Sequence, residues 1–228
     1  MFLLLRAINR NSEGSLTMAQ RTIHYAFGEI FSKQINLKDK NRFLLGSVMP
    51  DAYADVFDRD RTHYTTKTED QVYFDFCAFR EQYHELILKD DLYLGYYMHL
   101  AEDAFYRQFI YNGRFQMPRI REEVAILHND YHILNSHIVN KYNIHNALKT
   151  PIDLEQESIS KIATFIINEF IEDMSYDFKE QTIGETHFLT ESMVDEFIDK
   201  YVPLGLEELQ HIQSGKYTLQ ALDYAWAR

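Results

Sequence analysis

A histidine and two charged residues share one face of a predicted helix in the middle of the chain. The segment Tyr93–Arg107 contains no proline, and His99, Asp103 and Arg107 are spaced four residues apart, one helical turn from each other. Imidazole and carboxylate at this spacing can offer two ligands to one metal ion. The other faces carry Leu, Tyr, Met and Ala, so these polar groups need buried partners. One possible partner is a metal ion. In the simpler alternative, His99 and Asp103 form a hydrogen bond only with each other.

Three further residues complete a ligand set if the fold brings them to this helix. His24 lies in the first predicted helix. Asp51 follows a proline at a break in the chain, and His63 lies in the loop after it. Together with His99 and Asp103 they form a set of imidazoles and carboxylates, which zinc accepts as ligands. A single cysteine in the chain excludes a thiolate-rich zinc site.

Composition limits the class of protein and its partners. With 228 residues, 46% of them hydrophobic, the chain can bury one sizeable core. The net charge of −12 argues against extended nucleic acid as a partner and against an anionic membrane surface, since both require basic surfaces. The single cysteine excludes an intramolecular disulfide framework, and the apolar run after Met1 is too short for a signal peptide. We expect a cytoplasmic protein without stable membrane anchoring, and the sequence does not indicate its oligomeric state.

Helical periodicity recurs along the chain and predicts one all-α domain over residues 18–228. Residues 1–17 are expected to form a disordered leader, with Met18 as a candidate start of the protein. Only 8 glycines and 4 prolines occur, which disfavours a β-sandwich or barrel with its many turns. The predicted fourth helix takes Asp90 or Asp91 as its N-cap. The predicted helices cover residues 22–33, 36–43, 72–88, 91–111, 119–142, 154–174, 192–206 and 218–227.

Four motifs resemble a known family when they are read in order. They are Thr-x-His24-Tyr, Phe-Leu-Leu-Gly-Ser-Val-Met-Pro-Asp51-Ala, Thr-His63-Tyr and Leu-Gly-Tyr-Tyr-Met-His99-Leu-x-x-Asp103. The order is similar to that of the bacterial zinc-dependent phospholipase C family, which is related to the single-strand-specific zinc nucleases of fungi and plants. The resemblance covers roughly residues 18 to 142. It implies an all-helical fold that holds up to three zinc ions over a phosphodiester.

The resemblance also implies which residues bind zinc. One ion would be held by four residues, Asp51, His63, His99 and Asp103. Asp103 would bridge to a second ion, which it shares with His24. In the family's secreted enzymes this second ion is also bound by the free amino group of an amino-terminal tryptophan. This chain has no tryptophan before His24, so we expect one zinc site and a second only if a water replaces that nitrogen.

A weaker candidate site lies on the following predicted helix, in His128-Asn-Asp130-Tyr-His132. His128 and His132 are one turn apart and can share a metal ion, but no acid follows His132 at the family spacing. Successive helical residues are turned by about 100° from each other, so Asp130 points away from both histidines. Asp130 can instead orient a ligand histidine through a hydrogen bond.

Two functions agree with these residues. The first is a zinc-dependent hydrolase of a small phosphoester, in which Asp51 or Glu102 accepts a proton from the attacking water and Arg107 binds the phosphate. An ion pair with Asp103 is the alternative role for Arg107. The second function is a divergent, non-catalytic helical protein with a structural metal site. A phosphohydrolase of the His-Asp type is disfavoured, because the chain contains no His-Asp dipeptide.

Overall fold

Helices make up most of the chain in the computed structural model, which describes residues 19–111, 114–118, 120–179 and 182–228. The all-α prediction is therefore confirmed at the level of class, although a small three-stranded sheet is also present. The expected leader and Met18 lie outside the described residues. None of the described helices combines the length and the hydrophobicity needed to cross a lipid bilayer.

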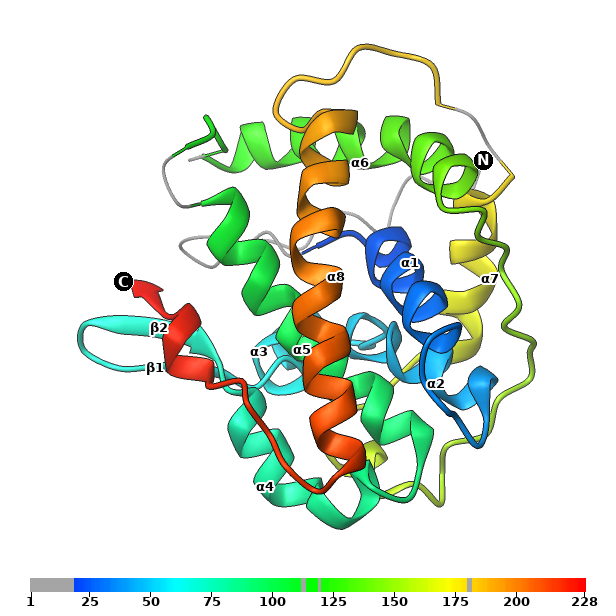
Figure 1. The fold of residues 1–228 in the computed structure, drawn as a ribbon. Helices are drawn as coiled ribbons and strands as arrows, with labels where there is room; N and C mark the ends of the chain where they lie inside the picture. Colours follow the sequence, from blue (N-terminus) through cyan, green and yellow to red (C-terminus); the bar gives the residue numbers. More distant parts are fainter. Residues whose placement is uncertain (1–18, 112–113, 119, 180–181) are drawn as a thin grey trace.

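The elements follow one another in chain order as shown in Figure 1. The α-helices are α1 (Arg21–Ser32), α2 (Lys40–Gly46), α3 (Arg59–Thr62), α4 (Phe76–Ile87), α5 (Asp91–Ile110), α6 (Arg121–Lys141), α7 (Ile167–Asp177) and α8 (Glu191–Gln213). Short 3-10 helices are η1 (Met49–Asp51), η2 (Val56–Asp58), η3 (Ser158–Lys161) and η4 (Ala221–Tyr224). The strands are β1 (Thr65–Lys67), β2 (Gln71–Phe74) and β3 (Trp226–Ala227).

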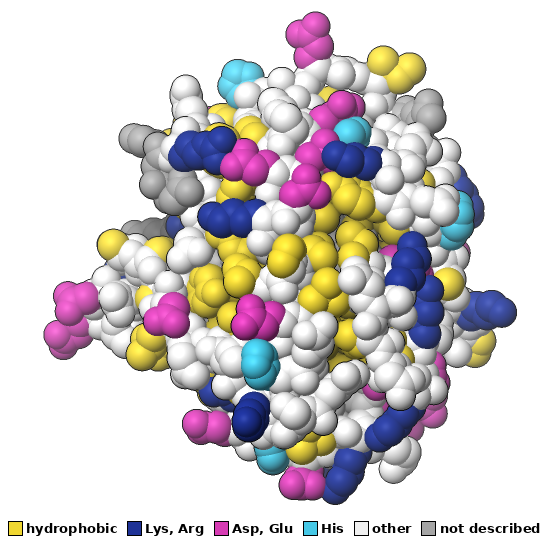
Figure 2. Space-filling view, in the orientation of Figure 1, with side chains coloured by type: hydrophobic (Ala, Val, Ile, Leu, Met, Phe, Trp, Pro, Cys, Tyr) yellow, Lys and Arg dark blue, Asp and Glu magenta, His cyan; other side chains and the backbone are white. Residues whose placement is uncertain are grey.

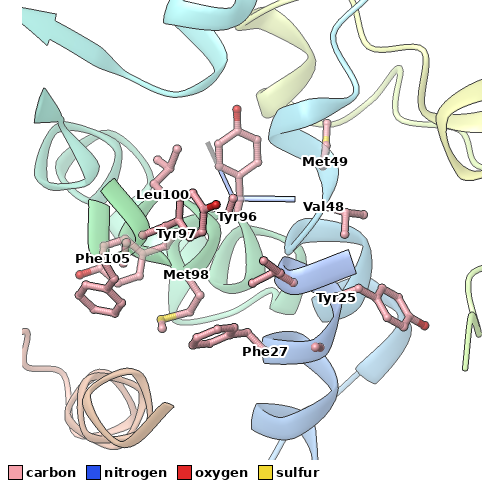
Figure 3. Packing of buried hydrophobic residues seen from close by; sticks show 14 of the residues in the cluster. Tyr25, Phe27, Val48, Met49, Tyr96, Tyr97, Met98, Leu100 and Phe105 are labelled. Carbon is pink, nitrogen blue, oxygen red and sulfur yellow. The ribbon is translucent and has the colours of Figure 1, made fainter. Parts of the chain in front are cut away.

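Helix α5 lies at the centre of the molecule. Its N-cap is Asp90, whose side chain accepts a hydrogen bond from the Leu92 N–H at 3.0 Å. Helices α2, α4 and α8 pack against it, and α8 runs across its front in Figure 1. Figure 3 shows Phe27 of α1 next to Met98 of α5 in the hydrophobic core. Polar side chains on α5 are consequently enclosed by other elements, so their partners must come from those elements.

Two glycines set the distance between α2 and α5. A Cβ atom at Gly46 would lie 2.1 Å from a backbone oxygen of α5, and one at Gly95 would lie 2.2 Å from a backbone oxygen of α2. Backbone overlaps of this size cannot be relieved by rotating a side chain. The close crossing brings the carbonyl oxygen of Ser47, just after α2, to 2.9 Å from His99 Nδ1. The glycines therefore position a residue of the candidate site.

The prediction of a helix over residues 72–88 is wrong in its first part. Gln71–Phe74 forms strand β2, which pairs antiparallel with β1 and, on its other edge, with β3 near the end of the chain. Helix α4 begins only after Asp75, whose side chain accepts a hydrogen bond from the Ala78 N–H. The predicted helix over 218–227 is also wrong, since this segment forms η4 and β3. Figure 1 shows the sheet projecting from the edge of the helical body, beside the C-terminus.

Other predicted boundaries also differ from the structure. The predicted helix over 154–174 is replaced by η3 and the shorter α7, and the predicted helix over 192–206 continues to Gln213. The short helix predicted over 36–43 starts later, at Lys40, after the capping side chain of Asp39. None of these boundary differences moves the histidines or acids discussed below.

Figure 2 shows hydrophobic side chains in the middle of one face, surrounded by charged side chains of both signs.

Candidate metal centre

The structure brings together the five residues that form the predicted ligand set. His24 comes from α1, Asp51 from η1, His63 directly follows α3, and His99 and Asp103 come from α5. Two groups of three residues each have ligand atoms that all lie within 4.8 Å of one another. The first group is His24, Asp51 and His99, and the second is His63, His99 and Asp103. These distances are compatible with shared coordination of one or two ions.

His63 lies at the middle of the cluster. Its Nε2 atom is 3.2 Å from Asp51 Oδ1, 3.3 Å from His99 Nε2 and 3.4 Å from Asp103 Oδ2. The Tyr96 hydroxyl donates a 2.6 Å hydrogen bond to the Thr62 carbonyl, which ties the segment carrying His63 to α5. The position of His63 next to α5 is therefore fixed by a buried hydrogen bond as well as by packing.

The outer ring nitrogens fix the tautomers of His63 and His99. His99 Nδ1 donates to the Ser47 carbonyl at 2.9 Å, and His63 Nδ1 donates to the Arg59 carbonyl at 3.0 Å. A carbonyl oxygen only accepts hydrogen bonds, so each proton lies on Nδ1 and each Nε2 carries a free lone pair. The two Nε2 atoms face each other at 3.3 Å and cannot hydrogen-bond in this state. A cation between them would turn this unfavourable contact into coordination.

His24 is oriented by a carboxylate. Its Nδ1 atom lies 2.9 Å from Glu102 Oε2, and its Nε2 atom lies 3.4 Å from Asp103 Oδ1. The His24 ring is stacked on the His99 ring at a centroid distance of 3.8 Å. A carboxylate on the outer nitrogen of a histidine is the usual companion of a metal ligand, because it fixes the tautomer and makes the imidazole more basic.

Several buried atoms of the cluster have no hydrogen-bond partner among the described residues. They are Asp103 Oδ2, His24 Nε2 and Glu102 Oε1, in side chains that are fully inaccessible to solvent. The other oxygen of Asp103, Oδ1, accepts a hydrogen bond from the Ala19 N–H at 3.1 Å. Unpaired buried polar atoms cost free energy. A metal ion on the Asp103 and His24 atoms would remove this cost, so the donor set fits a cation.

The electrostatics of the cluster show which protons a metal would replace. Burial alone would lower the pKa of His24, but the carboxylates of Asp103 and Glu102 raise it to about 10. Burial would raise the pKa of Asp103, yet His24 and His99 hold it well below its usual range. Burial raises the pKa of Glu102 to about 7. Burial and the charge of His24 lower the pKa of His99. A proton on His24 thus balances charge where a cation would otherwise do so.

Asp51 is the member of the set that reaches solvent. Its side chain is 16% exposed, whereas the side chains of His24, His63, His99 and Asp103 are completely buried. Burial would raise the pKa of Asp51, but the neighbouring imidazoles of His63, His99 and His24 lower it. Asp51 is consequently an ionised carboxylate and the one member of the set with a solvent-accessible side chain.

Arg107 does not form an ion pair with Asp103, which was the predicted alternative to a role in phosphate binding. Its guanidinium lies over the ring of Tyr111 at 3.9 Å and the ring of Trp226 at 4.9 Å. Its Nε atom is buried without an acceptor among the described residues. Asp103 instead faces the imidazoles of the cluster, among which the protonated His24 supplies positive charge at this depth. Arg107 therefore remains available for another anion.

The weaker candidates on α6 do not join the cluster. Asp130 is fully buried, and its carboxylate accepts hydrogen bonds from the backbone N–H groups of His187, Phe188 and Leu189 at 2.9, 2.7 and 3.0 Å. The expectation that Asp130 orients a ligand histidine is thus wrong, because the carboxylate binds a loop before α8. His128 and His132 lie on the surface, and the His132 side chain is 59% exposed.

No protein-family model, curated protein or solved structure matches this chain. The chemistry of the site is therefore inferred from its own residues and their geometry.

Sequence reasoning missed the groups that orient the ligands. The hydrogen bond of Glu102 to His24 has a sequence signal, since Glu102 is an acid in an apolar helix, 100° around from Asp103. The carbonyl oxygens of Ser47 and Arg59 have no such signal, because every residue carries a carbonyl. Their roles follow only from the close crossing of helices and from the turn at the end of α3.

Proposed function

We propose that the protein is a zinc-dependent hydrolase of phosphoester bonds, with a helical fold of the zinc phospholipase C and nuclease type. The observation that carries this proposal is the pair of facing Nε2 atoms of His63 and His99, held 3.3 Å apart by carbonyls that fix both tautomers. Together with the unpartnered oxygen of Asp103, this arrangement favours a bound cation over a hydrogen bond.

Zinc is the cation that the donor set favours. The ligands are imidazole nitrogens and carboxylate oxygens, with no thiolate, and the outer nitrogen of each imidazole has an acceptor. Zinc takes such mixed sets and commonly uses three or four protein ligands. His63, His99, Asp103 and Asp51 would hold one ion. His24 and Asp103 would hold a second, with Glu102 keeping the His24 ring in place.

Hydrolysis is favoured by the exposure of one side of the cluster. A bound zinc ion supplies positive charge for phosphate oxygens and makes a coordinated water acidic enough to act as a nucleophile. Asp51, the exposed member of the set, would help to hold the ion or accept a hydrogen bond from the nucleophilic water. Glu102 is unsuited to accept the water's proton, since it faces His24 and is inaccessible to solvent. Arg107, one turn beyond Asp103, offers a planar donor for a phosphate.

A small phosphoester is the substrate that the whole molecule favours. The net charge of −12 is unfavourable for binding extended nucleic acid, whereas a small anion needs only the local positive charge of the centre.

A structural metal site in a non-catalytic protein is the second candidate. It is favoured by the complete burial of four of the five ligands, because structural sites are closed to solvent. The two candidates predict the same metal content and differ in turnover.

Hydrolysis of phosphoesters by zinc-loaded protein separates the two. We expect bis(p-nitrophenyl) phosphate or p-nitrophenyl phosphate to be turned over by the parent, with loss of activity after chelation and recovery after zinc is added. Asp51→Asn should lower kcat by about 100-fold or more if Asp51 binds the ion or the water, while exposed His132→Ala should not change it. Stoichiometric zinc without turnover of any phosphoester in a broad panel would support the structural site and overturn the hydrolase.

A further inference from the structure

Two arginines beside the metal centre have no carboxylate partner among the described residues. Four other described arginines do: Arg21, Arg42, Arg61 and Arg114 each form an ion pair. Arg80 and Arg228 form no ion pair among the described residues, but they donate hydrogen bonds to the carbonyl oxygens of Leu219 and Thr68. In a chain with 35 acidic residues and 23 basic ones, a half-buried arginine without an acid nearby is unexpected. The two exceptions near the cluster are Arg59 and Arg107, both of intermediate exposure.

The backbone of Arg59 forms a hydrogen bond with His63, one of the proposed ligands. Arg59 is the first residue of α3, and its carbonyl accepts the hydrogen bond from His63 Nδ1. The acids on either side of it in the sequence are already paired, since Asp58 binds Arg61 at 2.8 Å and Asp60 binds Lys67 at 2.5 Å. Arg59, within one turn of His63, forms no ion pair among the described residues.

Arg107 is held rigidly on the other side. It is one helical turn beyond Asp103, and the rings of Tyr111 and Trp226 lie 3.9 and 4.9 Å from its guanidinium carbon. Aromatic faces hold a guanidinium in place without using its N–H groups. The buried Nε atom has no acceptor among the residues described. The N–H donors of Arg107 are thus oriented but unused.

Both arginines lie near His63. The Trp226 ring, which lies 4.9 Å from the Arg107 guanidinium carbon, packs on Phe74 with ring centroids 5.2 Å apart, and the Phe74 ring lies 6.2 Å from the ring of His63, whose Nδ1 binds the Arg59 carbonyl. Burial lowers the pKa of Arg107, and the positive charge of Arg59 lowers it further. The charge of Arg59 also acts on Tyr53, whose pKa is raised by burial and by Asp51 and is lowered by Arg59. Two cations placed together without a counter-ion destabilise the protein unless an anion is bound between them.

We propose that Arg59 and Arg107 form a binding seat for the phosphate group of the substrate and of the product. This inference rests on the proposed function, and it adds the residues that recognise the phosphate. The metal centre would bind one side of the phosphate near Asp51, and the guanidinium groups would bind the oxygens on the other side. Planar N–H donors match pairs of phosphate oxygens in geometry and charge, which a lysine does not.

Inorganic phosphate is the probe that tests this seat, with binding to zinc-loaded protein measured by isothermal titration calorimetry. Arg59→Gln removes one guanidinium, and Arg107→Lys retains the charge but loses the planar donor set, so the core position at Tyr111 and Trp226 is kept filled. Arg61→Gln is the matched control, because Arg61 lies on the same short helix, is 61% exposed and is paired with Asp58. Zinc content and thermal unfolding of each variant show whether the metal centre and the fold are retained.

We expect phosphate affinity to fall by about ten-fold or more in Arg59→Gln and in Arg107→Lys, and by less than about two-fold in Arg61→Gln. Equal affinity in the parent and in both variants, with zinc content unchanged, would overturn the seat and leave the hydrolase proposal standing. If the parent binds no zinc, the hydrolase proposal fails instead. The seat is then tested by the same variants in metal-free protein, where it still requires the loss in Arg59→Gln.

Discussion

Buried carboxylates occur in two regions of this molecule with opposite surroundings. In the region of α6 and α8, Asp130 accepts three backbone N–H groups, and Glu208 accepts the hydroxyls of Tyr97 and Thr218 and two backbone N–H groups. At the crossing of α1 and α5, Asp103 faces imidazole nitrogens, and its Oδ2 has no hydrogen-bond partner among the described residues. All three carboxylates are equally inaccessible to solvent.

The difference shows that burial of an acid does not by itself indicate a function. Asp130 and Glu208 are surrounded by N–H and O–H donors, which stabilise the charge and fix the loops that carry those donors. Asp103 faces imidazole nitrogens, and its Oδ2 has no hydrogen-bond donor among the described residues, so a cation would complete its surroundings. The first kind of acid stabilises the fold, and we propose that the second kind binds metal. Variants in the two regions should affect different properties.

The largest expected effect is the loss of metal in Asp103→Asn. This change removes the charge that two histidines face and leaves an amide group in a position that needs a lone pair. We expect zinc affinity to fall by more than about 100-fold, measured by competition with a chromophoric chelator. Retention of parental affinity in this variant would contradict the assignment of Asp103 to metal binding.

Asp130→Asn should show the opposite behaviour. The amide group would face N–H donors of Phe188 and Leu189, so the free energy of unfolding should fall by about 3 kcal/mol, as measured in urea. Zinc affinity of the folded variant should equal that of the parent. A loss of zinc in Asp130→Asn without a loss of stability would reverse the comparison.

Glu102→Gln tests the contact that orients a ligand. The amide keeps the size of the side chain but no longer provides a carboxylate to His24 Nδ1. We expect zinc affinity to fall by about 10- to 100-fold. A smaller effect in Glu102→Gln than in the surface variant Glu207→Gln would show that the contact has no role in binding.

Zinc affinity should also depend on pH, with a change per pH unit no larger than the effects of the substitutions above. Because the pKa of metal-free His24 is raised to about 10, its proton must leave before it can bind zinc. Apparent affinity for the ion that His24 holds should therefore rise by about ten-fold per pH unit between pH 7 and 10. The stabilisation that His24 gives to the metal-free fold is fully present below its unfolded pKa and is lost as the pH rises through about 10. Affinity independent of pH over this range would show that His24 is not protonated.

The part of the fold predictable from sequence is the part fixed by local patterns. Helix α5 and its cap at Asp90 follow from periodicity and from the capping preference of aspartate. The pairing of His99 with Asp103 follows from helical spacing. Strand β2 could not be placed, because it is stabilised by pairing with residues about 150 positions later in the chain and its aromatic residues also fit a helix.

The candidate site was partly predictable for the same reason. Residue types identified His24, Asp51 and His63, but their meeting point depends on the crossing of α2 and α5 at Gly46 and Gly95. Asp130 contacts a loop, and Arg107 contacts Trp226. In both cases the partner is far away in sequence, so spacing alone suggested the wrong partners.

Metal content is the measurement that tests the central claim most directly. Elemental analysis of protein purified without chelator should find one or more zinc ions per chain in the parent and in the control His132→Ala, and none in His99→Ala. Near-complete loss in His99→Ala with retention in His132→Ala would agree with a site at the crossing of α1 and α5. A parent without stoichiometric metal, even after zinc is resupplied, would contradict the account and leave the buried histidines with a role in packing alone.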